Sequence, residues 1–337
     1  MSTLARPILR LLVTLGCLAA APAVAEQEPG RLVRVGPVSL QINCTGAGSP
    51  TVVVETGLGD FAFDWKLVQE RVERFARVCT YDRGGYASSE LADVPRTFAQ
   101  LNLELHELLR AAGEKPPLVL VGHSFGGAVV RSYAARYPDD VAGLVLVESV
   151  AEHQPLVFDG KPTLLKDSAR GRAIPEPRLA APRATAPTSG APLESSLTDL
   201  DKLYSVLPAE LQLLHRRFAG AHELAAAEDS QRDWSSEYFA EWDQHPQRGL
   251  LSSRPLVVIT RAASGYDPSP SYSIQEVDAQ RLLSHTELLS LSRNSLQLVV
   301  PFGHDLHLEA PDLVACAVRG VVASARSRTP LTGCGCG

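Results

Sequence analysis

The chain has 337 residues, of which 45% are hydrophobic and 21% are charged. This balance excludes a disordered chain, which would carry fewer apolar residues, and the length allows one large domain with an insertion or two domains. The formal net charge is −6, and Lys and Arg form no cluster. The sequence therefore predicts no nucleic-acid partner, because such proteins usually carry a basic patch.

The first 25 residues are typical of a secretory signal peptide. Arg6 and Arg10 form a positive n-region, residues 11–21 are mostly apolar, and residues 23–25 fit the small-x-small cleavage pattern. An uncleaved N-terminal anchor is the alternative, although this apolar stretch is shorter than the roughly 20 residues that span a bilayer. We therefore expect a secreted or periplasmic protein with no stable membrane span.

Strands alternate with helices along the first half of the chain. The β-branched run at residues 51–55 suits a buried strand, and one face of residues 63–77 is apolar at helical spacing. Such alternation indicates parallel strands joined by crossover helices. The predicted strands are 31–43 (a pair around a turn), 51–55, 77–81, 118–121 and 143–147, and the helices are 63–77, 100–112 and 125–136.

The pattern breaks at residue 151 and resumes near residue 255. Between them we predict no comparable strand, helices at 208–218 and 233–242, and an irregular stretch at 174–192. After them we predict strands at 255–260 and 296–300 and helices at 274–291 and 311–325. The expected organisation is a sheet domain of residues 26–150 and 251–326, a cap inserted at 151–250, and a disordered tail at 327–337.

The cap carries an aromatic stripe at helical spacing. Its members are Trp234, Tyr238, Phe239 and Trp242. Such stripes usually form the core of the element that bears them, so we favour the core of the cap over a substrate pocket for these side chains.

The chemistry concentrates at a G-x-S-x-G motif around Ser124. The motif runs from Gly122 to Gly126, directly after the apolar strand and directly before the helix. This context exposes a serine nucleophile on a sharp turn, which requires small neighbours. A tight strand-to-helix turn without chemistry is the alternative.

Several motifs together resemble the α/β-hydrolase family. They are residues 55–59 (ETGLG), 81–85 (YDRGG), 122–127 (GHSFGG), 143–148 (GLVLVE) and 303–311 (GHDLHLEAP), in the family's order. The resemblance implies a mostly parallel central sheet flanked by helices, a Ser–His–acid triad and no cofactor or metal. Asp82 and Arg83 would order loops rather than take part in catalysis.

The resemblance places the general base at His304, which follows Gly303 just after the last strand. A serine hydroxyl needs such a base to take its proton. His307 is the competitor, but the Gly-His motif followed by Glu309 and Pro311 fits His304. We expect His123 to pack beside the nucleophile.

Two residues compete for the triad acid, which must lie between Ser124 and His304 in the chain. Glu148 ends the strand after the nucleophile helix, a site that some family members use. Asp267 lies in an irregular loop after residue 260, which is the family's more usual place. We favour Glu148 and keep Asp267 as the alternative.

Backbone amides are expected to hold the oxyanion that develops during acyl transfer. The Phe125 amide follows the nucleophile and is one donor. Leu58, between two glycines in the loop after the 51–55 strand, is the predicted second donor.

Secretion makes disulfides possible, and five cysteines follow the signal segment, so they cannot all pair within one chain. In the family, the strand that carries Cys44 runs beside the strand that carries Cys79, so the resemblance implies a disulfide between them. Two buried free thiols are the alternative. The pairing of Cys316, Cys334 and Cys336 is left open.

Together these features predict a serine hydrolase that cleaves esters of small to medium uncharged molecules through an acyl-enzyme. Amide or peptide cleavage, lactone opening and perhydrolysis use the same groups, and a silent binding protein on this scaffold is a further alternative. Epoxide hydrolysis and dehalogenation are disfavoured, because those relatives carry Asp in place of Ser124. The sequence does not predict the oligomeric state.

Overall fold

The computed structural model describes residues 28–158, 160–184, 202–263, 265 and 269–332. The predicted signal segment, Asp267, Cys334 and Cys336 lie outside these residues. Within them, no helix combines the length and the hydropathy that crossing a bilayer would need.

The core is an eight-stranded sheet in the order β1-β2-β4-β3-β5-β6-β9-β10. Strand β2 runs antiparallel to its neighbours β1 and β4, and the other neighbouring strands are parallel. The mostly parallel sheet that the sequence predicted is therefore confirmed. The strands are β1 (Arg31–Val35), β2 (Val38–Thr45), β3 (Thr51–Glu55), β4 (Val78–Tyr81), β5 (Leu118–His123), β6 (Val141–Val147), β9 (Leu256–Arg261) and β10 (Ser295–Val300).

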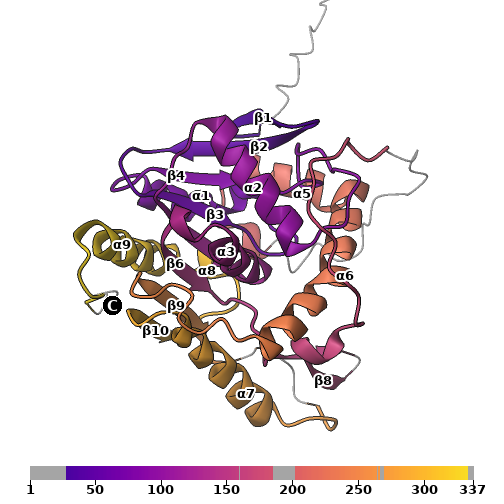
Figure 1. Ribbon diagram of the computed structural model, residues 1–337, viewed down its shortest axis with the longest axis vertical. Coiled ribbons are helices and arrows are strands. Elements are labelled where there is room, and N and C mark those ends of the chain that lie inside the picture. The colour runs from indigo at the N-terminus through magenta and orange to yellow at the C-terminus, as the bar shows by residue number, and fades with distance from the viewer. Residues whose placement is uncertain (1–27, 159, 185–201, 264, 266–268, 333–337) are drawn as a thin grey trace, which may run out of the picture.

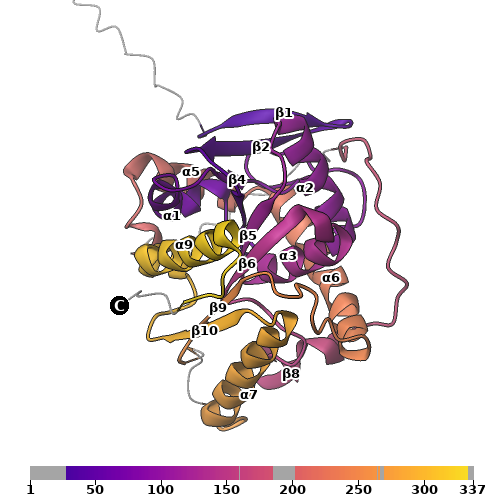
Figure 2. The ribbon, with the colours of Figure 1, turned by 60° about the vertical axis from the view of Figure 1, so that its left-hand side comes forward.

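Helices cover both faces of this sheet. Figure 2 shows α1 (Lys66–Val72) and α9 (Pro311–Ser327) on one side, and α2 (Phe98–Ala112) and α3 (Phe125–Arg136) on the other. Alternate strand residues point to opposite faces, so Val119 and Val121 pack with the first pair while Leu118 and Leu120 pack with the second. Helix α7 (Ile274–Glu287) joins β9 to β10, and the short α8 (Leu306–Glu309) follows β10.

The predicted helix at 63–77 is shorter in the structure. A 3₁₀ turn, η1 (Ala62–Trp65), precedes α1, and α1 ends at Val72. The amides of Phe75 and Ala76 both donate to the Val72 carbonyl, which closes the helix with a turn. The chain turns here because Val78 already enters β4.

The insertion between β6 and β9 contains two long helices, α5 (Ala209–Ala219) and α6 (His222–Gln244). It also contains an antiparallel hairpin, β7 (Pro155–Phe158) and β8 (Lys161–Leu164), so the expectation of no strand in this region is wrong. These four-residue strands each contain a proline and show no alternation, which explains why the sequence pattern did not reveal them.

The remaining short 3₁₀ segments are η2 (Pro138–Asp140), η3 (Leu165–Ser168) and η4 (Leu288–Leu291).

The aromatic stripe of α6 packs onto the sheet domain and not within the insertion alone. Phe98 at the start of α2 contacts three members of the stripe, with ring centroids 4.6 Å from Tyr238, 6.0 Å from Phe239 and 5.6 Å from Trp242. Trp234 lies apart and packs against the Arg172 guanidinium. Our assignment of the stripe to the core of the cap was therefore wrong: it joins cap and sheet.

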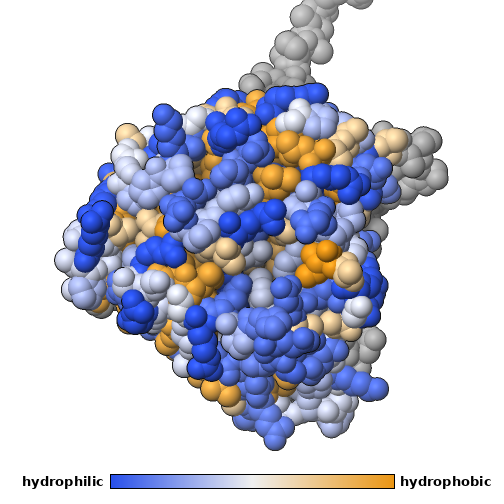
Figure 3. Space-filling view, in the orientation of Figure 1, coloured by the Kyte–Doolittle hydropathy of each residue, from blue (hydrophilic) through white to orange (hydrophobic). Residues whose placement is uncertain are grey.

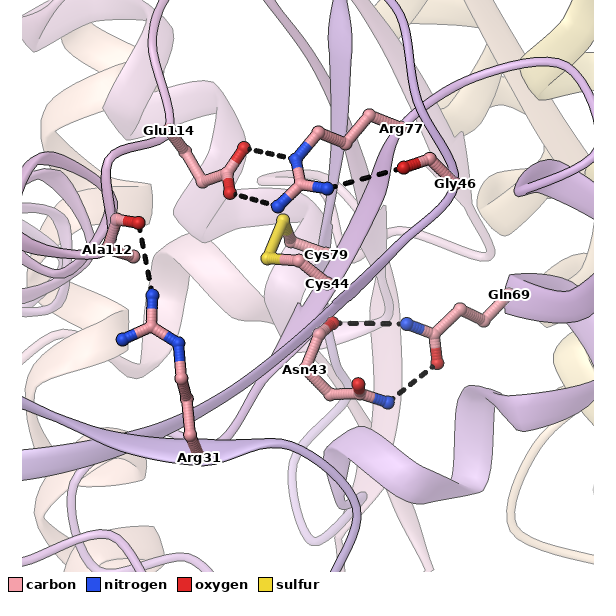
Figure 4. The surroundings of a disulfide bond; sticks show 9 residues. All are labelled: Arg31, Asn43, Cys44, Gly46, Gln69, Arg77, Cys79, Ala112 and Glu114. Carbon is pink, nitrogen blue, oxygen red and sulfur yellow. Dashed lines mark hydrogen bonds and ion pairs between the residues drawn. A yellow bond between two sulfur atoms is a disulfide. The ribbon is translucent and has the colours of Figure 1, made fainter.

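The predicted Cys44–Cys79 disulfide is confirmed in the structure. The two residues face each other across the antiparallel β2–β4 pair, 35 positions apart in sequence. Figure 4 shows the Arg77–Glu114 ion pair beside it, with two hydrogen bonds of 2.7 and 2.6 Å. Cys316 on α9 is also disulfide-bonded.

One face of the molecule carries its apolar residues in separate groups (Figure 3). On the face shown in Figure 3, hydrophilic residues separate the apolar ones.

Near the expected tail, the Leu331 amide donates a 2.8 Å hydrogen bond to Asn294, so the packed chain continues past residue 326.

Candidate active site

Ser124 occupies a strained turn between β5 and α3. Its φ is 52° and its ψ is −119°, a backbone conformation that residues with a Cβ seldom adopt and that clusters at functional sites. Three backbone hydrogen bonds hold the turn: the Ser124 amide donates to Val147, and the amides of Gly127 and Val150 donate to the Ser124 carbonyl. The strand–turn–helix context that the motif predicted is present.

The glycines of the motif allow close packing of the backbone. A Cβ on Gly126 would lie 2.4 Å from the carbonyl oxygens of both Glu55 and Thr56. A Cβ on Gly122 would lie 2.6 Å from the Gly126 carbonyl. Both distances are shorter than real carbon–oxygen contacts, so the motif fits only with glycine at these places.

His304 and Glu148 meet at the carboxyl ends of β10 and β6. His304 Nδ1 lies 3.5 Å from Glu148 Oε2, and the His304 side chain is 36% exposed while that of Glu148 is 2% exposed. Within the described residues, no hydrogen bond joins the Ser124 hydroxyl to His304. Such bonds are often long in free enzymes and tighten when substrate binds.

The Glu148 carboxylate has a positively charged environment. The Arg261 amide donates to Oε1 at 2.6 Å, the Arg261 side chain lies 2.8 Å from Oε2, and Arg281 lies 3.4 Å from Oε1. Burial raises the pKa of Glu148, but the hydrogen bond to His304 and the charges of His285 and Arg261 outweigh it, so the pKa is lowered. The group is therefore an ionised acceptor aimed at His304. Asp267, the alternative acid, lies outside the described residues.

The two predicted oxyanion donors lie in segments that pack together. Phe125 is the first residue of α3, and the first amides of a helix have no partner within it. The Leu58 amide donates no hydrogen bond within the described residues. Leu58 packs against the cluster that contains Phe125.

Arg83 orders the loop that carries Leu58, as the sequence predicted. Its guanidinium donates to Glu55 Oε1 at 2.7 Å, to the Thr56 carbonyl at 2.8 Å and to the Gly57 carbonyl at 2.6 Å. The arginine side chain is 1% exposed. This loop, residues 56–60, is called the oxyanion loop below.

His307 is not placed as the general base. It is buried and stacks on Trp65, with ring centroids 4.8 Å apart and planes at 6°. Burial lowers its pKa to about 3, so the ring is neutral. Of these two histidines, His304 lies beside the Glu148 carboxylate.

Sequence reasoning missed Asp60. This buried carboxylate accepts from the Gly57 amide at 3.1 Å and from His123 Nδ1 at 2.9 Å. Polar atoms of Asp60, His123 and His307 lie within 4.8 Å of one another, but both nitrogens of His123 already make hydrogen bonds. The group is therefore a hydrogen-bond network. An Asp three positions after a glycine in a loop was the only sequence signal for it.

Comparisons with known proteins establish the family. Residues 50–311 match the model of the alpha/beta hydrolase fold family, and the chain belongs to that family.

Two relatives illustrate the sequence similarity. Over 103 residues the chain is 34% identical to the uncharacterized protein YqjL of Bacillus subtilis. The matched segment covers 31% of this chain and 41% of that protein. Over 126 residues it is 32% identical to the 2-hydroxy-6-oxo-2,4-heptadienoate hydrolase of Pseudomonas putida, covering 36% and 45%. The chain spans less than half the length of these curated relatives.

Solved structures show the same fold across most of the chain. A meta-cleavage product hydrolase from Pseudomonas fluorescens IP01 superposes with a TM-score of 0.61 and 17% identity, covering 89% of this chain and 99% of that one. A thermophilic esterase from Thermogutta terrifontis gives 0.57 and 19%, covering 86% and 94%. An epoxide hydrolase, CorEH, gives 0.58 and 13%, covering 87% and 98%. At these identities the likeness defines the fold alone.

Proposed function

We propose that this protein is a secreted or periplasmic serine hydrolase that cleaves carboxylic esters of small to medium uncharged molecules. The observation that carries the proposal is Ser124, held at a φ of 52° on the turn between β5 and α3. The His304–Glu148 pair at the carboxyl ends of β10 and β6 supports it, because this base and acid are what a serine nucleophile needs.

The proposed mechanism assigns one role to each group. Ser124 Oγ attacks the ester carbonyl while His304 Nε2 takes its proton and then gives it to the departing alcohol. Glu148 keeps the proton of His304 on Nδ1 and stabilises the imidazolium that forms. The amides of Phe125 and Leu58 hold the oxyanion. A water molecule, activated by His304, then releases the acid from Ser124.

The surroundings of the oxyanion donors support an uncharged substrate. Leu58 and Phe125 belong to an apolar cluster that also contains Tyr238, Phe239 and Trp242 of the cap. Most of this cluster is buried between cap and sheet, but it makes the wall behind the oxyanion donors apolar, which favours aliphatic or aromatic groups over charged ones.

Similarity to one relative favours a second candidate, hydrolysis of a carbon–carbon bond in a 2-hydroxy-6-oxo dienoate. The curated relative from Pseudomonas putida is named as a hydrolase of 2-hydroxy-6-oxo-2,4-heptadienoate. Amide, lactone and perhydrolase reactions would use the same triad, and a silent binding protein would use none of it.

A panel of p-nitrophenyl esters of increasing chain length tests the proposal. We expect turnover that is highest for short to medium acyl chains and absent in Ser124→Ala. A 2-hydroxy-6-oxo dienoate assayed in parallel tests the second candidate. Turnover of the dienoate alone, or equal ester turnover by Ser124→Ala, would refute the ester proposal. N-terminal sequencing of exported protein checks the proposed cleavage after Ala25.

A further inference from the structure

His123 links three segments of the site through one buried ring. Its side chain is 2% exposed, and Nδ1 lies 2.9 Å from Asp60 Oδ2. On the other side of the ring, Nε2 lies 3.0 Å from the carbonyl oxygen of His304. The ring itself is attached to the nucleophile turn, because His123 immediately precedes Ser124.

The two partners of this ring define its protonation state. A carbonyl oxygen can only accept, so Nε2 must carry a proton. Asp60 Oδ2 also accepts from the Gly57 amide at 3.1 Å, which is the behaviour of an ionised carboxylate. Nδ1 must then donate to Asp60 as well, and a ring that donates from both nitrogens is an imidazolium.

The charges around the ring agree with this state. Burial raises the pKa of Asp60, but the hydrogen bond and charge of His123 outweigh it and hold that pKa well below its usual range. Burial lowers the pKa of His123, and Asp60 and Asp305 reverse the effect and raise it. The other titratable rings facing His123 are His304 and the neutral His307, with ring centroids at 4.8 and 5.0 Å.

We propose that His123 is a positioning residue whose imidazolium holds the backbone of His304 and, through Asp60, the oxyanion loop in register with Ser124. The inference rests on the proposed function, since it concerns how that triad is assembled. The Nε2 donor of His123 fixes the loop that carries His304. The Nδ1 donor fixes the Asp60 carboxylate, which shapes the turn at Gly57, next to Leu58.

The arrangement implies a pH dependence on the alkaline side. When the pH rises through the raised pKa of His123, the ring loses one proton and one of its two hydrogen bonds. The stability contributed by this ion pair is fully present below the pKa of histidine in the unfolded chain. It is lost as the pH rises through the higher pKa of His123 in the folded protein. Turnover should fall over the same interval.

The test compares His123→Gln and His123→Leu in the full-length secreted protein. Each preparation is titrated with a fluorophosphonate so that kcat refers to sites that can react. Glutamine can donate to the His304 carbonyl without titrating, whereas leucine cannot donate. We expect Leu to lower kcat by about 10- to 100-fold, the scale of a misplaced catalytic group, with KM within about threefold, and Gln to restore most of kcat.

The pH profile separates positioning from packing. We expect the alkaline fall in kcat of the parent to be missing in His123→Gln. Asp60→Asn provides a second route, because it leaves His123 neutral with the proton on Nε2; it should retain kcat within about tenfold and also lose the alkaline fall. His106→Leu, at a half-buried ring between α2 and α3, is the matched control and should change stability alone.

Two results would overturn the inference. One is a His123→Leu variant with the kcat of the parent per labelled site. The other is an alkaline fall that persists unchanged in both His123→Gln and Asp60→Asn. A parent that is not labelled at Ser124 would instead refute the proposed function, so the two failures can be told apart.

Discussion

Two regions of the sheet differ in what stabilises them: the carboxyl ends of the central strands, and the edge formed by β1, β2 and β4. At the strand ends, Ser124 and Glu148 both have positive φ, 52° and 46°, and buried charges face each other. At the edge, regular strand pairing is reinforced by the Cys44–Cys79 disulfide and the Arg77–Glu114 ion pair.

This difference suggests that the strand ends serve catalysis, whereas the edge serves the stability of the fold. Strained backbone and buried carboxylates cost folding free energy and persist only because their surroundings impose them. A cross-link acts mainly by limiting the unfolded chain. Substitutions at the strand ends should therefore change turnover more than stability, and substitutions at the edge should do the reverse.

The largest effect is expected for Ser124→Ala. Loss of the nucleophile should lower kcat by roughly 10⁵-fold or more, while the free energy of unfolding changes by less than about 1 kcal/mol, because only one hydroxyl is removed. Ester turnover and urea unfolding measure the two quantities. A variant that unfolds much more easily would contradict the separation.

Glu148→Gln should reduce kcat by about 10²- to 10⁴-fold, because the neutral amide no longer fixes the useful tautomer of His304. Some stability should be lost as well, since Arg261 and Arg281 lose their shared carboxylate. Glu152→Gln is the matched control: it removes the charge and one of the two hydrogen bonds of the pair with Arg131 at the same end of the sheet. If both variants lose kcat equally, Glu148 has no special part in catalysis.

Replacing both Cys44 and Cys79 with Ala should lower the free energy of unfolding by about 3 to 4 kcal/mol, from loop-entropy arithmetic. Turnover should not change under conditions in which the variant remains folded. Chemical denaturation with and without reductant, beside ester turnover, measures this. A fall in kcat of the folded variant would show that the edge also shapes the site.

The smallest effect is expected on acidification. The pKa of Glu148 is lowered in the folded protein, so its contribution to stability is present above the pKa of the unfolded carboxyl and is lost as the pH falls through the folded pKa. Acid unfolding of the parent should therefore be steeper than that of Glu148→Gln. Parallel curves would contradict an ionised, hydrogen-bonded Glu148.

Local sequence predicted the parts of the site that depend on neighbours in the chain. The strand, serine and helix around Ser124 follow from one motif, and the position of His304 followed from the family resemblance. Asp60 was missed because its partner His123 lies 63 residues away in the sequence. The charged first half of α6 likewise hid the true start of that helix at His222.

The aromatic stripe shows a different limit of sequence reasoning. Spacing placed Tyr238, Phe239 and Trp242 on one helical face, but a periodic pattern does not say what covers that face. Only the tertiary structure shows that Phe98 from α2 does so. Patterns in a sequence thus predict elements more reliably than they predict the partners of those elements.

Labelling with a fluorophosphonate, followed by mass spectrometry of the peptide that spans residues 122–136, tests the central claim most directly. We predict one adduct per chain, on Ser124, and no adduct in Ser124→Ala. An intact, folded parent that takes up no label, or a label on a different residue, would contradict the assignment of Ser124 as the nucleophile.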